Sequence, residues 1–382
     1  MPKIKVFRIV TSEFALLAHL SNTLNRIDET FKFYVIGDNV SSVSKIYPEV
    51  IFIDLPIKRK ISLFYDFIST FKLIFYCIKI KPQIIHSIMP KAGLISSIAG
   101  FISRVPIRIH TFTGQIWLTY TPIKKFYYIQ FDKLIKSLNT ECFTDSESQS
   151  SLLFKYGIKA KNNQPLEYFL KGSLSGVDIN KFNPQLRHSR DVCFLRKNLG
   201  IEENDFVILY MARKSIDKGA IDFLRIIYLL QKKTINRVIK FLFIGPDESN
   251  CEIQKYFDSN NILSNLIILD TVSNHQNYIS CSNILCLPSH KEGFGSIVID
   301  CAAIGVPTIG YNIVGLSDAI VDNFTGFLVK ENDIEKFVEK IIYLIENTEI
   351  LSKFSINCVN NTIQNYNADL FYNKLKSVYL KK

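Results

Sequence analysis

The 382-residue sequence predicts an α/β protein of two doubly wound domains, each a parallel sheet with helices on both faces. Two observations predict this class. Short apolar runs alternate with longer amphipathic segments along nearly the whole chain. The chain is also longer than one ordinary core requires, and 47% of its residues are hydrophobic, so two large cores are available.

The first series of elements predicts an N-terminal domain over residues 1–185. Its apolar runs predict strands near 4–10, 32–37, 50–54, 83–87, 107–111 and 140–144. Segments with helical periodicity predict helices near 13–26, 61–80, 91–103, 122–137 and 146–155. In the segment 61–80 one helical face carries Phe64, Phe67, Ile68, Phe71, Ile74, Phe75 and Ile78. We expect this face to pack on the sheet; a helix that lies on a membrane is the alternative.

The polar segment Gly172–Arg190 predicts a linker, and a second series then defines a C-terminal domain over residues 186–360. Its strands are expected near 205–211, 239–244, 265–270, 283–287, 307–310 and 326–329, with helices near 218–233, 295–304 and 333–346. We expect the last stretch, 361–382, to carry a helix over Ala368–Leu380 that returns to the N-terminal domain. Ligands are expected in a cleft between the domains, at the carboxyl ends of the strands.

The excess positive charge lies in the first half of the chain. Residues 1–185 contain 24 Lys/Arg and 13 Asp/Glu, a net charge of +11, whereas residues 186–382 contain 22 of each. A basic half indicates an anionic membrane surface or a phosphate-bearing substrate, and no RNA-binding motif or Cys/His finger favours nucleic acid. Eight cysteines without a CxxC pair indicate reduced thiols, and no uncharged apolar run is long enough to predict a spanning helix. We therefore expect a cytoplasmic protein.

The segment Pro288–Asp300 carries the most informative pattern. A buried strand ends at Pro288, and an acid, Glu292, and two glycines precede a helix that contains Asp300. Backbone N–H groups at such a helix start attract an anion, while a carboxylate beside them favours neighbouring hydroxyls, so the pattern predicts a sugar nucleotide. Asp300 lies about 7 Å along the helix from its start, which would let Glu292 take the sugar and Asp300 the ribose. The phosphates would then lie over Gly293, Phe294, Gly295 and Ser296; the alternative is a solvated acid at a helix start.

A second pattern follows the strand near 205–211. Arg213 and Lys218 are five residues apart at the end of that strand, where two cations can neutralise a departing diphosphate without a metal. Ordinary surface cations are the alternative. The turn at Gly245 and Pro246 ends another strand and is expected to border the nucleotide.

The stretches ARKSIDKG, FIGPDES and LPSHKEGFGSIVIDCAAIGVPTIG, with HSIMPKAGLISSIAG, IRIHTFTGQIW and GSLSGVDINKFNP before them, resemble family 4 glycosyltransferases of GT-B fold. They are similar to bacterial capsule, O-antigen and bacillosaminyl-diphosphoundecaprenol transferases. The resemblance implies a retaining transferase that moves a hexose or N-acetylhexosamine, without a catalytic metal, from a UDP-linked donor to a polyprenyl-diphosphate-linked saccharide. Because its first half is basic, we also expect the protein to attach peripherally at the inner, anionic face of the cytoplasmic membrane.

By the same resemblance, Arg213 and Lys218 match the diphosphate-binding pair, and Glu292 matches the first acid of an E-x7-E motif. Asp300 stands where the second glutamate is usual. In the first domain the resemblance points to residues of the expected cleft at strand ends: Thr11, Ser12, Lys91, Gly93, His110, Thr113, Gly114 and Gln115. Thr113 replaces a histidine that many relatives carry. His110 stays a candidate, although a lone histidine at the end of an apolar strand is more often a core residue than a catalyst.

No pattern in the sequence predicts a metal site: the six histidines show no HxH or HExxH spacing, and no DxD occurs. Two other functions stay open. A sugar-nucleotide epimerase of the same fold would act without an acceptor, and a basic scaffold protein of envelope assembly would bind no nucleotide.

Overall fold

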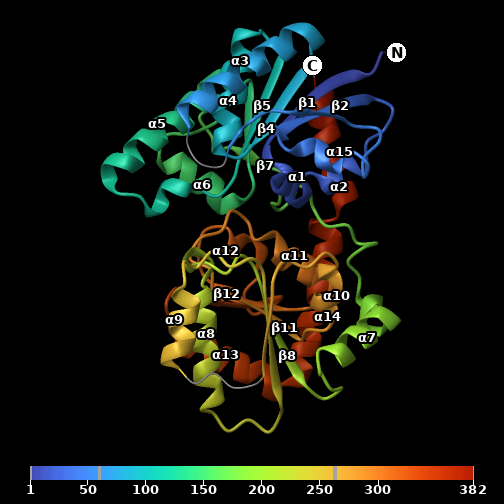
Figure 1. Ribbon diagram of the computed structural model, residues 1–382, viewed down its shortest axis with the longest axis vertical. Helices are drawn as coiled ribbons and strands as arrows, with labels where there is room; N and C mark the ends of the chain where they lie inside the picture. The colour runs from blue at the N-terminus through green and yellow to red at the C-terminus, as the bar shows by residue number, and fades with distance from the viewer. Residues whose placement is uncertain (1, 59–61, 261–264, 382) are drawn as a thin grey trace. The chain divides into compact units, whose positions relative to one another are not determined.

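The computed structural model describes residues 2–58, 62–260 and 265–381. The chain forms two compact units (Figure 1). Unit 1 comprises Met1–Gly176 and Ala368–Lys382, and unit 2 comprises Val177–Asn367. The chain therefore passes between the units at 176/177 and 367/368, where the sequence analysis put boundaries at 185/186 and 360/361.

Unit 1 contains a seven-stranded sheet of order β3-β2-β1-β4-β5-β6-β7, in which every pair is parallel. The strands are β1 (Ile4–Ser12), β2 (Phe31–Asp38), β3 (Ile51–Asp54), β4 (Ile84–Ile88), β5 (Ile107–Phe112), β6 (Glu141–Thr144) and β7 (Glu167–Tyr168). The helices are α1 (Glu13–His19), α2 (Ser21–Leu24), α3 (Leu63–Ile80), α4 (Pro90–Ile102), α5 (Pro122–Leu138), α6 (Glu147–Lys155) and α15 (Ala368–Leu380), with 3₁₀ turns η1 (Val40–Val43) and η2 (Ile116–Thr119).

The C-terminal helix α15 belongs to unit 1 and packs on its sheet. Phe371, Leu375 and Tyr379 are buried among strand residues such as Phe31 and Phe33. The hydroxyl of Tyr379 accepts a 2.5 Å hydrogen bond from the buried guanidinium of Arg8, which also contacts Nδ1 of His86 at 2.7 Å. Apolar burial and this polar contact together hold the last helix against β1 and β4.

The apolar face expected to pack α3 on the sheet is for the most part exposed, so that expectation is wrong. Phe67, Phe71 and Phe75 are more than half exposed, while Ser69, Leu73 and Cys77 on the opposite side of α3 are buried. The helix has two apolar sides, and the side with smaller side chains fits against the core. Residue 61, where this helix was expected to begin, lies outside the described residues.

Unit 2 contains a six-stranded parallel sheet of order β10-β9-β8-β11-β12-β13. The strands are β8 (Phe206–Met211), β9 (Ile239–Ile244), β10 (Leu266–Leu269), β11 (Ile284–Leu287), β12 (Thr308–Tyr311) and β13 (Gly326–Val329). The helices are α7 (Arg190–Asn198), α8 (Ala220–Gln231), α9 (Glu252–Ser259), α10 (His275–Ser280), α11 (Ser296–Ile304), α12 (Leu316–Ala319), α13 (Ile334–Glu346) and α14 (Thr348–Asn365), with 3₁₀ turns η3 (Pro184–His188) and η4 (Ile216–Lys218).

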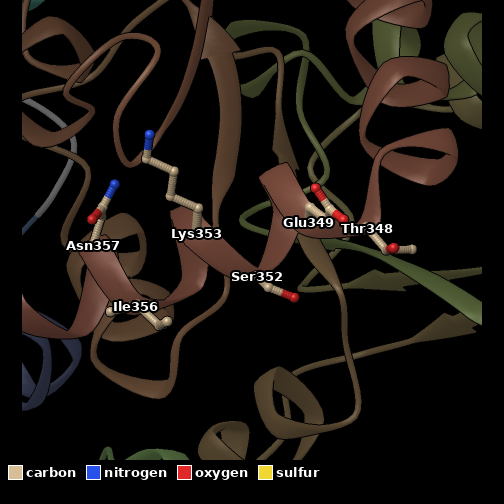
Figure 2. A pocket seen from close by; sticks show the side chains of 6 residues that line it. All are labelled: Thr348, Glu349, Ser352, Lys353, Ile356 and Asn357. Atoms are coloured by element: carbon tan, nitrogen blue, oxygen red, sulfur yellow. The ribbon is translucent and has the colours of Figure 1, made fainter.

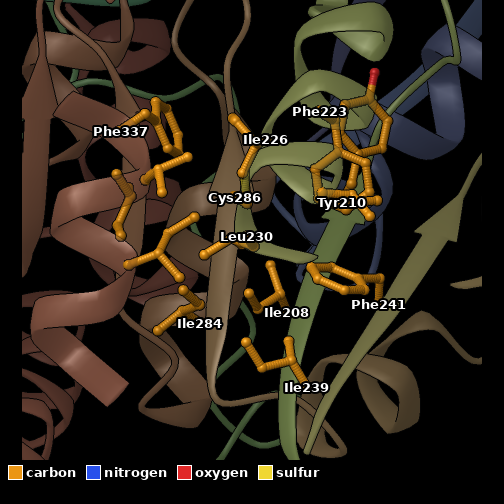
Figure 3. Close-up of a cluster of buried hydrophobic side chains, with 14 of the residues drawn as sticks. Ile208, Tyr210, Phe223, Ile226, Leu230, Ile239, Phe241, Ile284, Cys286 and Phe337 are labelled. Carbon is orange, nitrogen blue, oxygen red and sulfur yellow. The ribbon is translucent and has the colours of Figure 1, made fainter. Parts of the chain in front are cut away.

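One core of unit 2 lies between the sheet and the helices α8 and α13 (Figure 3). Strand residues such as Ile208, Tyr210 and Ile284 meet Phe223 of α8 and Phe337 of α13 there. A second cluster on the other face joins β8, β9 and β11 to α11. Helices on both faces of a parallel sheet confirm the doubly wound class.

Several expected elements differ in detail from those observed. The helix expected over 13–26 is two, since α1 ends at His19 and α2 begins at Ser21. The two-residue strand β7 and the helices α7, α9, α10, α12 and α14 were not among the expected elements. Most of these are short, and their polar residues mask the periodicity on which the sequence analysis relied.

Candidate functional site

The predicted residues of unit 2 gather where the strand order reverses. β8 and β11 are hydrogen-bonded neighbours, whereas the chain runs outward from β8 to β9 and β10 on one side and from β11 to β12 and β13 on the other. The loops after β8 and β11 therefore leave the sheet side by side at its carboxyl edge. In open α/β sheets this switch point is where ligands bind.

Two glycines let the loops at this edge approach one another. A Cβ added to Gly219, whose φ is +70°, would lie 1.8 Å from the carbonyl oxygen of Pro288. A Cβ on Gly245, at φ +140°, would lie 1.9 Å from the carbonyl oxygen of Ala212. No side chain fits either place, so the loops after β8, β9 and β11 pack backbone against backbone.

Lys218 and Glu292, which the sequence placed on separate loops, are in direct contact. The Nζ atom of Lys218 lies 2.8 Å from Oε1 of Glu292 and donates a 2.8 Å hydrogen bond to the carbonyl of Lys291. The two side chains are only 17% and 12% exposed. A shielded pair of this kind presents a cation and an anion, which can bind a phosphate and a hydroxyl group respectively.

Arg213 lies at the end of β8 and is held by two carboxylates. Its guanidinium contacts Glu248 at 2.5 Å and Asp217 at 3.1 Å. Burial alone would lower the pKa of Arg213, but the hydrogen bond with Glu248 and the charge of Asp217 raise it. The guanidinium is thus fixed and charged, and a fixed fork of donors suits phosphate oxygens.

The helix α11 begins at Ser296 with Gly295 as its N-cap, directly after the Glu292 loop. Its first backbone N–H groups and dipole favour an anion. Phe294 is buried against Tyr366, with ring centroids 5.6 Å apart, so only its backbone can face a ligand. Asp300 lies in the second turn, where burial raises the pKa of its carboxyl to about 7, against an opposing effect of Lys181.

Sequence reasoning missed a polar network beneath the Glu292 loop. The buried carboxylate of Asp222, on α8, accepts a 2.9 Å hydrogen bond from the Tyr311 hydroxyl and lies 3.1 Å from Nε2 of His290. Nδ1 of His290 lies 2.8 Å from Glu331. The hydrogen bond to Asp222 raises the pKa of His290, against the effect of burial. The sequence signal for this network is Asp222 itself, an acid within the apolar stripe of α8, because a buried carboxylate needs hydrogen-bond partners.

In unit 1 several predicted residues lie at the carboxyl ends of β1 and β4, which are again neighbours at a reversal of strand order. The hydroxyl of Thr11 contacts the Met89 sulfur at 3.2 Å, and Ser12 caps α1. Lys91, in the first turn of α4, forms a 2.7 Å ion pair with Asp66 of α3. The ammonium group therefore ties two helices together, and the pair would have to open before Lys91 could bind an acceptor phosphate.

His110, Gly93 and Gln115 are buried, which corrects the expectation that these residues line a cleft. Nδ1 of His110 forms a 2.9 Å hydrogen bond with the hydroxyl of Ser87. Burial lowers the pKa of His110 to about 3. A Cβ on Gly93 would lie 2.4 Å from the His110 ring, so this glycine makes room for the histidine. Gln115 is 2% exposed and bonds to the Thr113 carbonyl, while Thr113 and Gly114 keep partly accessible positions after β5.

A hollow on unit 2 lies apart from the predicted site residues. It is lined by Thr348, Glu349, Ser352, Lys353, Ile356 and Asn357, all from α14 (Figure 2). None of them belongs to a strand-end loop, and the hollow carries no candidate function. Over the described ranges, no cluster of His, Cys, Asp or Glu side chains has the geometry of a metal site. No described helix combines the length and apolar character that a membrane crossing requires.

Two doubly wound units of this kind define the GT-B fold class. A glycosyltransferase from Rickettsia africae ESF-5 superposes with a TM-score of 0.78 at 18% identity, over 99% of this chain and 98% of that one. The sequence pattern of "Glycosyl transferases group 1" matches residues 192–361.

Two curated relatives extend the likeness over most of the chain. The capsular polysaccharide biosynthesis glycosyltransferase CapM of Staphylococcus aureus is 30% identical over 328 residues, 85% of this chain and 83% of CapM. The UDP-Gal:alpha-D-GlcNAc-diphosphoundecaprenol alpha-1,3-galactosyltransferase of Escherichia coli is 25% identical over 324 residues, which are 84% of this chain and 81% of that enzyme. The chain belongs to the group 1 family of glycosyl transferases, which confirms the resemblance drawn from the sequence.

Proposed function

We propose that the protein is a retaining glycosyltransferase that moves a hexose or N-acetylhexosamine from a UDP-linked donor to a polyprenyl-diphosphate-linked saccharide in surface polysaccharide synthesis. The observation that carries the proposal is the contact between Lys218 and Glu292 at the switch point of unit 2. Two relatives supply the substrate classes. CapM acts in capsular polysaccharide biosynthesis, and the E. coli enzyme transfers galactose from UDP-galactose to a diphosphoundecaprenol-linked sugar.

Unit 2 would bind the donor. The N-terminus of α11 and the cations Arg213 and Lys218 would hold the diphosphate, with Gly245 and Pro246 bordering the nucleotide. Glu292 would accept hydrogen bonds from sugar hydroxyls, and Asp300 from the ribose. Lys218 can then exchange part of its contact with Glu292 for a phosphate oxygen.

In the proposed reaction the acceptor hydroxyl attacks the anomeric carbon on the face from which the diphosphate leaves. The bond from the anomeric carbon to the phosphate oxygen breaks, the new glycosidic bond forms, and the hydroxyl proton passes to the departing phosphate oxygen. Arg213 and Lys218 would stabilise the negative charge that develops on this oxygen. Unit 1, with its excess of basic residues, would bind the lipid-linked acceptor and contact the anionic membrane.

A screen of nucleotide sugars against a diphosphate-linked saccharide acceptor tests the proposal. We expect one UDP-sugar to give a product whose anomeric configuration, determined by NMR, matches that of the donor. Lys218→Ala, Arg213→Ala and Glu292→Gln should each lower turnover about a hundredfold or more. Lys336→Ala, which breaks an exposed Lys–Glu pair on α13, is the matched control and should leave turnover unchanged.

Two results would count against the proposal. Wild-type turnover by all three site variants would remove the donor-site assignment. Conversion of the nucleotide sugar in the absence of any acceptor would instead identify an epimerase.

A further inference from the structure

The outer side of α3 is apolar and uncovered. Five large side chains on this side are 55–70% exposed: Phe64, Phe67, Phe71, Phe75 and Ile78. They recur every three or four residues, so they form one stripe, and the rings of Phe67 and Phe71 pack on each other at 4.4 Å. A stripe of this size is unusual on a surface that faces only water.

The helix α5 has the same construction. It buries Ile129, Asp132 and Ile135 on its inner side. On its outer side Ile123, Phe126, Tyr127, Phe131 and Leu134 are 40–75% exposed. α4 packs between α3 and α5 in one layer of unit 1 (Figure 1). We call these two outer stripes, five residues from each helix, the aromatic face.

The charge around the aromatic face is of one sign. Lys72, Lys79 and Lys81 flank the stripe of α3, and Lys124 and Lys133 flank that of α5. None of these lysines pairs with a carboxylate among the described residues. The acids of both helices are engaged inward: Asp66 pairs with Lys91 at 2.7 Å, and Asp132 accepts a 2.7 Å hydrogen bond from Trp117. The face therefore combines exposed rings with uncompensated positive charge.

We propose that the aromatic face inserts into the headgroup region of a bilayer that contains anionic lipids. Helices that lie in a membrane interface combine an apolar side with flanking lysines, and aromatic rings are favoured at that depth. A second copy of this chain fits less well, because pairing two such faces would bring lysines against lysines. The inference rests on the proposed function, since a lipid-linked acceptor places the substrate at a membrane.

Vesicle flotation measures the proposed contact directly. Wild-type protein should bind vesicles of phosphatidylglycerol and phosphatidylcholine, and bind phosphatidylcholine vesicles more weakly. A variant with Phe67→Ser, Phe71→Ser and Phe75→Ser should bind the anionic vesicles at least about tenfold more weakly. The matched control, Phe194→Ser with Ile356→Ser, removes two equally exposed apolar side chains of unit 2 and should bind as the wild type does.

Fluorescence quenching tests whether the face inserts or only lies near the surface. Phe71→Trp introduces a ring on the aromatic face, and the single native tryptophan, Trp117, is buried in unit 1. Vesicles with brominated acyl chains should quench the new tryptophan. They should not quench Phe194→Trp, the control on unit 2.

Three results would overturn the inference. They are failure of the wild type to bind anionic vesicles, equal binding by the triple variant and the wild type, and an unquenched Phe71→Trp in bound protein. Dissociation of a wild-type dimer by the triple variant would assign the face to self-association instead. A water-soluble, short-chain acceptor separates this inference from the proposed function: absence of transfer to it by every form contradicts the function, whereas normal transfer without vesicle binding contradicts only the membrane contact.

Discussion

Replacing Gly219 with alanine tests whether close backbone packing brings the two halves of the candidate site together. Gly219 adopts φ +70°, and the added Cβ would lie 1.8 Å from the Pro288 carbonyl oxygen, where real Cβ atoms keep at least 3.0 Å. The loops after β8 and β11 must therefore separate by more than 1 Å. Because Lys218 and Glu292 stand on these two loops, their contact should be lost as well.

The size of the effect follows from two contributions. A left-handed conformation costs a residue other than glycine about 1–2 kcal/mol. Overpacking of a tight contact costs about 1–3 kcal/mol more. Gly200→Ala isolates the first contribution, because Gly200 has φ +62° and no atom within 4 Å of the added Cβ. We therefore expect Gly219→Ala to lower the free energy of unfolding by about 1–3 kcal/mol more than Gly200→Ala does.

Urea unfolding followed by circular dichroism measures the stability of both variants, and calorimetric titration with UDP measures binding. A shift of about 1 Å in a positioned group can lower turnover about a hundredfold, so Gly219→Ala should also lose transfer activity. Equal stability, UDP affinity and turnover in the two variants would refute the reasoning.

Three further predictions concern polar groups that the fold buries fully or in part. His290→Gln should flatten the pH dependence of stability above pH 6.5. A histidine whose pKa is raised on folding stabilises the folded state fully below pH 6.5, and this contribution is lost as the pH rises through the raised pKa. The same pH profile in the variant and the wild type would contradict this. Tyr379→Phe should lower the free energy of unfolding by about 1–3 kcal/mol, since it removes the hydroxyl that accepts from buried Arg8. Tyr372→Phe should cost less, because the Tyr372 hydroxyl accepts a long, 3.4 Å hydrogen bond from the backbone of Asp28. Equal losses of stability in the two variants would argue against the Arg8 contact. Asp300→Asn should stabilise the protein at pH 8 but not at pH 3, because a carboxyl whose pKa is raised to about 7 on folding opposes folding where it ionises. Urea unfolding at both pH values measures the change in stability, and an equal change at pH 3 and pH 8 would contradict the prediction.

Local sequence patterns identified the strand ends whose residues the structure brings together at the candidate site of unit 2. The runs that end at Met211 and Leu287 are apolar enough to identify buried strands, and turn residues after them identify the strand ends. Parallel sheets bring such ends to one edge, which explains why Lys218 and Glu292 meet although 74 positions separate them.

Other features depend on tertiary packing that no local pattern reports. Both sides of α3 are apolar, so periodicity alone could not show which side packs against the core. The sequence left His110 open between a cleft and a core position, and the core position depends on Gly93, which lets α4 cover the histidine ring. Asp222 and His290 are 68 positions apart, and their contact could not be predicted without the register of the sheet that brings them together.

The most direct test of the central claim is a calorimetric titration of wild type and Lys218→Ala with UDP, with Lys336→Ala as the control. If the ammonium group beside Glu292 binds the diphosphate, Lys218→Ala should weaken UDP binding at least about tenfold, while Lys336→Ala leaves it unchanged. Equal affinity of wild type and Lys218→Ala for UDP, or no binding by wild type, would contradict the account.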